Sequence, residues 1–227
     1  MRHPQRLWRE SGNLAQDRRP HGLHDHPARL RQRLQTEVDK LAAIPGVTHI
    51  LLAYGRCGDG LVGLRSGLVT LVLPRAHDCI SILLGGPDCH EAILRENPTV
   101  YFYSPGWIRG HRVPVPDREK HTREFYTARY PDDPETVDDL LAADTELFAR
   151  HDCVAYVDLT NDSVAENYCR GCARHLGWRF RKLNGDAALL SNLLSGPWPA
   201  AHFVVAPPGH VFALAPGGEL AATATSP

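Results

Sequence analysis

The residues best suited to chemistry in this chain of 227 residues are cysteines and histidines that follow apolar runs. Cys57 lies in the turn YGRCGDG, directly after the run VTHILLAYG. His77, Asp78 and Cys79 follow a second run, GLVTLVLP. The same tripeptide recurs at residues 151–153, so the sequence raises the question of a duplicated site. Thiolates and imidazoles bind metals, and thiolates are also nucleophiles.

Strand-like and helix-like patterns alternate along the chain that must position these residues. We expect strands at residues 47–55, 67–74, 99–106, 153–160, 178–183 and 201–209. We expect helices at residues 27–43, 79–86, 118–130, 134–150, 162–177 and 186–196. This alternation predicts an α/β fold with a mostly parallel sheet and helices on both faces. We expect a Rossmann-like arrangement, either as a single domain over residues 27–214 or as two halves.

Composition narrows the class of protein. Residues 1–26 are basic and polar and residues 215–227 lack an apolar pattern, so we expect both tails to be disordered. The formal net charge is −1, which argues against a nucleic-acid partner. We expect no membrane association and a cytoplasmic location, because neither an apolar span nor a secretory signal is visible. In that reducing compartment cysteines are thiols or ligands rather than disulfides.

The placement of Cys57 and Cys79 permits two readings, a metal site or a structural role. Functional groups in parallel sheets gather at the carboxyl ends of strands, and both cysteines follow a predicted strand. If the two strands are neighbours, Cys57, His77 and Cys79 form three ligands with one coordination position open, as in catalytic zinc sites or a cluster with one uncoordinated iron. The alternative is two small buried cysteines in tight turns.

Neighbouring residues have candidate roles at the same edge. Gly55 and Gly58 let the backbone turn tightly and approach a ligand. Arg75 is placed to hold an anion, or forms a surface ion pair. Asp78 positions His77 or acts as a base. Trp107, after the strand ending at YSPGW, lines a pocket or belongs to the core.

The remaining cysteines fit structural roles better. Cys153 begins a predicted strand, so it lies at the opposite, amino end of the sheet, and the second tripeptide is a coincidence. Cys169 and Cys172 share a helix, where an apolar face favours burial. Cys89 is expected in an exposed turn, with a spare ligand as the alternative. The chain has no P-loop and no GxGxxG, HExxH or GxSxG motif, which weakens readings as a nucleotide-dependent enzyme or a serine hydrolase.

Six segments carry a resemblance to a known family: LHDHPARL, YGRCGDGL, LVLPRAHDCISILLGG, YFYSPGW, GWRFRKLNGDAALLSNLLSGPW and FVVAPPG. Together they resemble domain of unknown function 1638 (DUF1638). The resemblance covers roughly residues 21–210. It carries Cys57, Asp78 and Cys79 as the positions that match family motifs, whereas His77 is replaced by Asp in some members. Family members usually begin with a further strand that ends in a cysteine, and this chain departs from that pattern because its first 20 residues contain neither.

The resemblance implies an iron–sulfur cluster held by three cysteines, of which this chain retains two. It also implies a link to anaerobic one-carbon metabolism, with a corrinoid or methyltransferase partner. We therefore expect a metal- or iron–sulfur-binding α/β protein, with zinc as the other candidate ion and a small-molecule ligand at the open position. The alternatives are a thiol-redox protein and a non-enzymatic accessory protein that use Cys57 and Cys79 without a metal. The residues do not decide whether the chain is an enzyme.

Overall fold

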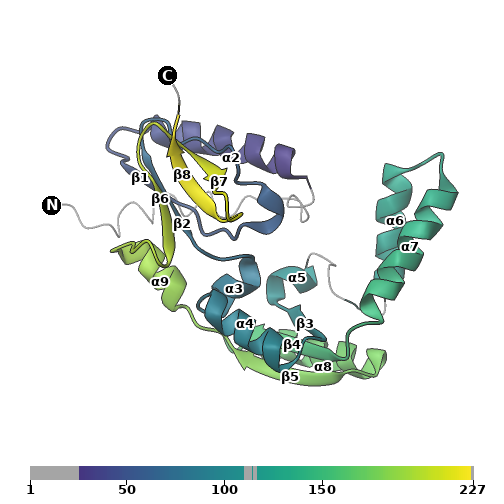
Figure 1. Cartoon of the computed structure of the whole chain (residues 1–227). Coiled ribbons are helices and arrows are strands. Elements are labelled where there is room, and N and C mark those ends of the chain that lie inside the picture. Colours follow the sequence, from purple (N-terminus) through teal and green to yellow (C-terminus); the bar gives the residue numbers. More distant parts are fainter. Residues whose placement is uncertain (1–25, 110–113, 115–116, 226–227) are drawn as a thin grey trace. The chain divides into compact units, whose positions relative to one another are not determined.

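The computed structural model describes residues 26–109, 114 and 117–225 (Figure 1). The chain forms two compact units. One consists of Met1–Ile82 together with Ala188–Pro227, and we call it the split unit. The other, Leu83–Ala187, interrupts it and is called the inserted unit. The sequence left open either a single domain over residues 27–214 or two halves, and the middle of the chain makes most of its contacts with itself.

The split unit begins with helix α2 and is completed by strands from both ends of the chain. Its elements are α2 (Pro27–Ala42), β1 (His49–Leu51), the short 3-10 helix η3 (Cys57–Asp59), β2 (Thr70–Pro74), α3 (Cys79–Leu83), α9 (Ala188–Ser195), β6 (Phe203–Ala206), β7 (His210–Leu214) and β8 (Leu220–Ala224). Helix α3 starts in the split unit and ends on the first residue of the inserted unit.

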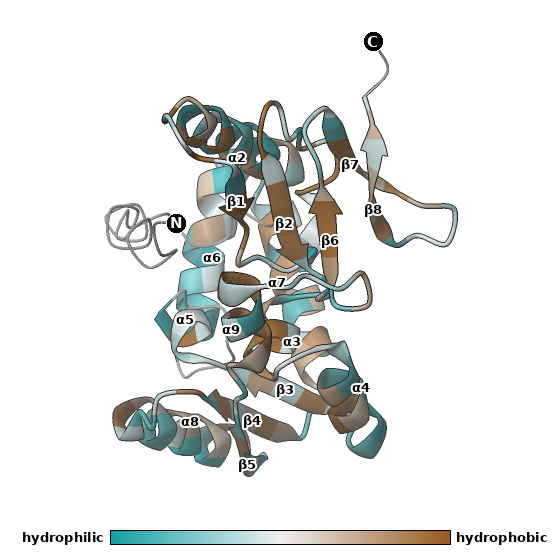
Figure 2. Cartoon of the chain, turned by 90° about the vertical axis from the view of Figure 1, so that its left-hand side faces the viewer, coloured by the Kyte–Doolittle hydropathy of each residue, from teal (hydrophilic) through white to brown (hydrophobic). Residues whose placement is uncertain are grey.

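The sheet of the split unit has the strand order β1-β2-β6. β1 and β2 are parallel, with Ile50 opposite Leu71, whereas β6 is antiparallel to β2, with Phe203 opposite Pro74. β7 and β8 form a separate antiparallel ribbon. Strands β2 and β6 are predominantly hydrophobic in Figure 2, because both are buried in the core of this unit.

Two apolar clusters hold the split unit together. One joins α2, β2 and the β7–β8 ribbon through buried residues that include Val38, Leu71 and Phe212. The other packs Leu193 of α9 and Phe203 of β6 against Val72 of β2. Both clusters contact β2, so this strand is the centre of the unit.

The inserted unit is a parallel sheet with flanking helices. Its elements are α4 (Pro87–Glu96), β3 (Val100–Tyr103), α5 (Pro105–Arg109), α6 (Arg118–Arg129), α7 (Pro134–Phe148), β4 (Cys153–Asp158), α8 (Ser163–Leu176) and β5 (Arg179–Asn184). The strand order is β3-β4-β5 and all pairs are parallel. β4 is buried along its whole length. Helix α8 turns a buried side with Cys169, Cys172 and Ala173 toward a core that includes Tyr103 and Tyr156.

The prediction of an α/β fold rich in parallel strands is confirmed, but the described residues form three small sheets instead of one. The exception among the pairs of the two three-stranded sheets is β6, which runs antiparallel to β2, with its first residue Phe203 opposite Pro74 at the carboxyl end of β2. The segment 215–227 was expected to be disordered, yet its residues 220–224 form β8, which pairs along its full length with β7. The basic segment 1–26 lies outside the described residues except for His26. None of the helices in the described part of the chain combines the length and apolarity needed to cross a bilayer.

Candidate functional site

The loops that follow β1 and β2 lie side by side. The two strands are hydrogen-bonded neighbours and run in the same direction, so their carboxyl ends meet at one edge of the sheet. The loop after β1 carries Cys57, and the loop after β2 carries His77 and Cys79. The adjacency on which the metal hypothesis depends is therefore present in the backbone.

At Gly55 the two loops approach each other closely. A Cβ atom added at Gly55 would lie 2.5 Å from the carbonyl carbon of Asp78 and 2.6 Å from its Cα. The neighbouring amide of Arg56 donates a hydrogen bond of 2.9 Å to the carbonyl of Ala76. Gly55 therefore lets two backbones touch, rather than leaving space for a ligand at that point.

Arg56 fixes the shape of the loop around Cys57. Its Nε atom lies 2.6 Å from Oδ1 of Asp59, and one terminal nitrogen donates to the carbonyl of Gly218. Gly58 has a φ of +65°, which glycine adopts without steric cost. The backbone of Cys57 belongs to η3, but its side chain lies outside the described residues.

Asp78 caps the short helix that begins at Cys79. Its Oδ1 atom accepts hydrogen bonds from the amide of Ser81 at 2.8 Å and from the Ser81 hydroxyl at 3.0 Å. The His77 side chain is 81 % exposed, and its Nδ1 atom lies 3.5 Å from Oδ2 of Asp78. Cys79 is partly buried and takes part in no disulfide with another described cysteine. Asp78 thus contacts both His77 and the helix start, which agrees with a positioning role.

Arg75 and Trp107 have other contacts in the structure. Arg75 donates from Nε to the carbonyl of Ala200 and from a terminal nitrogen to the carbonyl of Leu220. These bonds tie the end of β2 to the C-terminal part of the split unit and use two of the five N–H donors of the guanidinium. Trp107 belongs to the inserted unit, where it packs partly buried against the cluster around Tyr103.

The other cysteines are placed as their sequence positions suggested. Cys153 is the first residue of β4 and is buried, and burial raises the pKa of its thiol. Cys169 and Cys172 are buried on α8, and burial raises both thiol pKa values. Thiols of this kind are poor nucleophiles and poor ligands. Cys89 is exposed as expected, but it lies in the first helical turn of α4 and not in a connecting loop.

Sequence reasoning missed a charged cluster at the carboxyl end of β4. Nζ of Lys182 lies 2.9 Å from Oδ2 of Asp158 and 2.8 Å from Oε2 of Glu166. Hydrogen bonds to Glu166 and Asp158 raise the pKa of Lys182, and the bond to Lys182 lowers the pKa of Asp158. The cluster links β4, β5 and α8. One signal for this cluster was available in the sequence, because Asp158 is an acidic residue at the end of a fully buried strand.

Among the described side chains, which exclude that of Cys57, no three His, Cys, Asp or Glu residues lie together in a group that could hold a metal ion. A site of three such ligands would therefore need a side chain from outside the described set, and Cys57 is the candidate whose backbone lies in the loop adjoining that of His77 and Cys79. Two cysteines and one histidine from adjoining loops match the donor chemistry of a catalytic zinc site.

Comparison with curated proteins and with solved structures gave no match. A family model does match, over residues 19–194, and this range contains both cysteine loops and the whole inserted unit. The match covers well over half of the chain. The chain therefore belongs to the family described as Protein of unknown function (DUF1638).

Proposed function

We propose that this protein binds a metal ion or an iron–sulfur cluster at the carboxyl edge of β1 and β2, with Cys57 and Cys79 as ligands and His77 as the third. The observation that carries the proposal is the contact between the two loops, where Arg56 donates to Ala76 and Gly55 touches the backbone of Asp78. A bound zinc ion or cluster would supply an open coordination position for a small molecule.

The protein's own residues would prepare that site. Arg56 and Asp59 hold the turn around Cys57, and Asp78 contacts His77 while it caps α3. A carboxylate beside a histidine ligand fixes the orientation of the ring. We leave Arg75 out of the ligand-binding role, because two of its donors are bound to carbonyls.

The proposed setting is the cytoplasm. None of the five cysteines whose side chains are described takes part in a disulfide, which agrees with a reducing compartment. We also propose that each unit is a Rossmann-like half, and that a small molecule or a corrinoid-dependent methyltransferase is the partner of the metal site.

The test is anaerobic purification of the full chain, followed by metal analysis and a visible spectrum. We expect iron with sulfide, or zinc, in stoichiometric amount, and its loss in Cys57→Ser and in Cys79→Ser. Cys89→Ser is the matched control, because Cys89 is exposed on α4 and is not a proposed ligand, so this variant should keep the metal. His77→Ala should weaken binding without abolishing it.

Two outcomes would contradict the proposal. A metal-free protein in which Cys57 and Cys79 oxidise together to a disulfide would establish the thiol-redox alternative, which the same loop contact also permits. Metal that survives both serine variants would mean that the ligands lie elsewhere. Capture of a corrinoid protein by a metal-free chain, without turnover, would instead support the accessory role.

A further inference from the structure

Helices α6 and α7 form a helical hairpin, residues 118–148, in which little is buried. The structure buries no residue of α6 and only Val137 and Leu141 of α7. Isolated helices of this length are marginal in water, because helices in proteins owe most of their stability to packing of one face. Two exposed large apolar side chains, Phe125 and Leu147, also lie on this hairpin.

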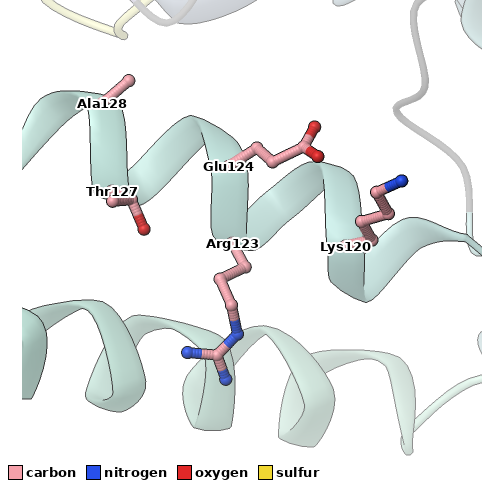
Figure 3. Close-up of a pocket in the computed structure, with 5 residues that line it drawn as sticks. All are labelled: Lys120, Arg123, Glu124, Thr127 and Ala128. Carbon is pink, nitrogen blue, oxygen red and sulfur yellow. The ribbon is translucent and has the colours of Figure 1, made fainter.

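Two ion pairs hold the hairpin together. Arg118 and Asp144 are partly buried and form a bidentate pair with distances of 3.0 and 2.7 Å. Arg123 lies 2.7 Å from Asp138. In Figure 3 the Arg123 side chain points toward the neighbouring helix, whereas Lys120 and Glu124 point away from it. The pairs account for one side of α6 and leave the other side exposed.

The surface of α6 has a hollow whose lining residues, which include Arg123, follow helical spacing. Its volume is about 590 Å³, and the residues that line it lie three, four, seven and eight positions apart along a single helix: Lys120, Arg123, Glu124, Thr127 and Ala128 (Figure 3). Residues at these intervals share one face of a helix. Small side chains at Thr127 and Ala128 and longer ones at Lys120 and Glu124 leave a depression that a second helix can enter, as ridges enter grooves in helix packing.

The two helices of the hairpin carry opposite charge. Lys and Arg outnumber Glu on α6, whereas every charged residue of α7 is acidic. The acidic residues of α7 are Glu135, Asp138, Asp139, Asp144 and Glu146. Lys120 and Asp139 are both exposed and take no part in the two ion pairs of the hairpin. A surface with a basic helix beside an acidic helix is complementary to a copy of itself turned by a two-fold axis.

We propose that this protein forms a homodimer in which the α6–α7 hairpins of two copies pack as a four-helix bundle, α6 of each copy against α7 of the other. Such an interface is isologous, so every α6-to-α7 contact occurs twice. The proposal is independent of the metal site, because the hairpin lies in the inserted unit and both cysteine loops lie in the split unit.

The test is sedimentation equilibrium of the full chain across a range of protein and NaCl concentrations. We expect a monomer–dimer equilibrium that shifts toward monomer as salt rises, because charge complementarity is screened. Lys120→Glu and Asp139→Lys should each weaken dimerisation about tenfold, since each reversal replaces an attraction by a repulsion at two symmetric positions. Lys40→Glu makes the same charge change on α2 of the split unit and should leave the equilibrium unchanged.

Mixing the two single variants is the decisive step. In a mixed dimer, Glu at position 120 meets Lys at position 139, and the second contact is the native one, so the mixture should dimerise better than either variant alone. A wild-type chain that stays monomeric at every concentration would overturn the proposal. A dimer that withstands both charge reversals and high salt would equally overturn it, because the interface would then lie elsewhere. The salt series requires no variant, so the proposal stays testable even if a substitution disturbs folding.

Discussion

Replacing Gly55 by alanine should separate the two cysteine loops. The added Cβ would lie 2.5 to 2.7 Å from the carbonyl carbon, Cα and carbonyl oxygen of Asp78, all backbone atoms that cannot rotate away. Ordinary contacts between non-bonded carbon atoms are about 3.5–4.0 Å, so the loops must move apart by about 1 Å. That movement would stretch the 2.9 Å bond from Arg56 to Ala76 beyond hydrogen-bonding distance.

The expected cost follows from these contacts. Overpacking costs about 1–3 kcal/mol and loss of one hydrogen bond about 1 kcal/mol. The smaller entropy of the unfolded alanine chain offsets about 0.4–1 kcal/mol of this. The net loss of about 2 kcal/mol corresponds to a fall in Tm of about 4–8 °C for a chain of this size. Because Gly55 does not have a positive φ, the collision alone causes the loss.

The assay is thermal and urea denaturation, with hydrogen exchange at the Arg56 amide as a local readout. Gly217→Ala is the matched control, because Gly217 belongs to the same unit, lacks a positive φ and has nothing within 4 Å of an added Cβ. The control should change the stability by less than about 0.5 kcal/mol. If Gly55→Ala unfolds at the same temperature as the wild type and keeps its Arg56 amide protected, the close contact between the loops is refuted.

Three further outcomes are expected. Asp162→Ala removes the side chain that accepts from the first amides of α8, so stability should fall by about 1 kcal/mol in thermal melts, and an unchanged Tm would contradict the capping role. The pKa of Asp158 is lowered in the folded state, so its contribution is present above the ordinary pKa of about 3.9 and is lost as pH falls through the lowered pKa; the Lys182→Met variant should lose that acid-side dependence in pH-resolved melts. A thiol reagent should modify Cys89 in the native protein but reach buried Cys169 only after unfolding, and rapid native labelling of Cys169 would show that α8 opens readily.

The sequence contained enough information to predict the central strands β2 and β4, but too little to predict β8. Continuous apolar runs predict β2 and β4 because both are buried on both faces. Strand β8 has the sequence LAATA, whose small residues have no strong strand preference, so it depends on pairing with β7 and was missed. Helix α4 was also missed, although Pro87 and Asp88 in its first turn are ordinary signals of a helix start.

The sequence predicts that the two cysteine loops are neighbours, but it does not predict the contacts between them. The rule that functional groups follow parallel strands places Cys57 and Cys79 together, and the pairing of β1 with β2 agrees with it. The contact of Gly55 with Asp78 depends on the register of Ile50 opposite Leu71, which no local pattern specifies. The carbonyl partners of Arg75 lie more than a hundred positions away in the sequence, so its structural use was equally hidden.

The chain enters and leaves the inserted unit at adjacent positions. The amide of Asp186 donates to the carbonyl of Leu83 at 2.9 Å, and Leu84 and Asp186 form a parallel bridge, so its two ends lie side by side. On the ribosome, the partners of β3, β4 and β5 emerge in immediate succession, and this unit can fold as it is made. β2 emerges early but must wait for β6, which is synthesised only after the whole inserted unit. Until β6 has been synthesised, the apolar edge of β2 has no strand to cover it. The loops that carry Cys57 and Cys79 therefore belong to the part of the protein that completes its folding last.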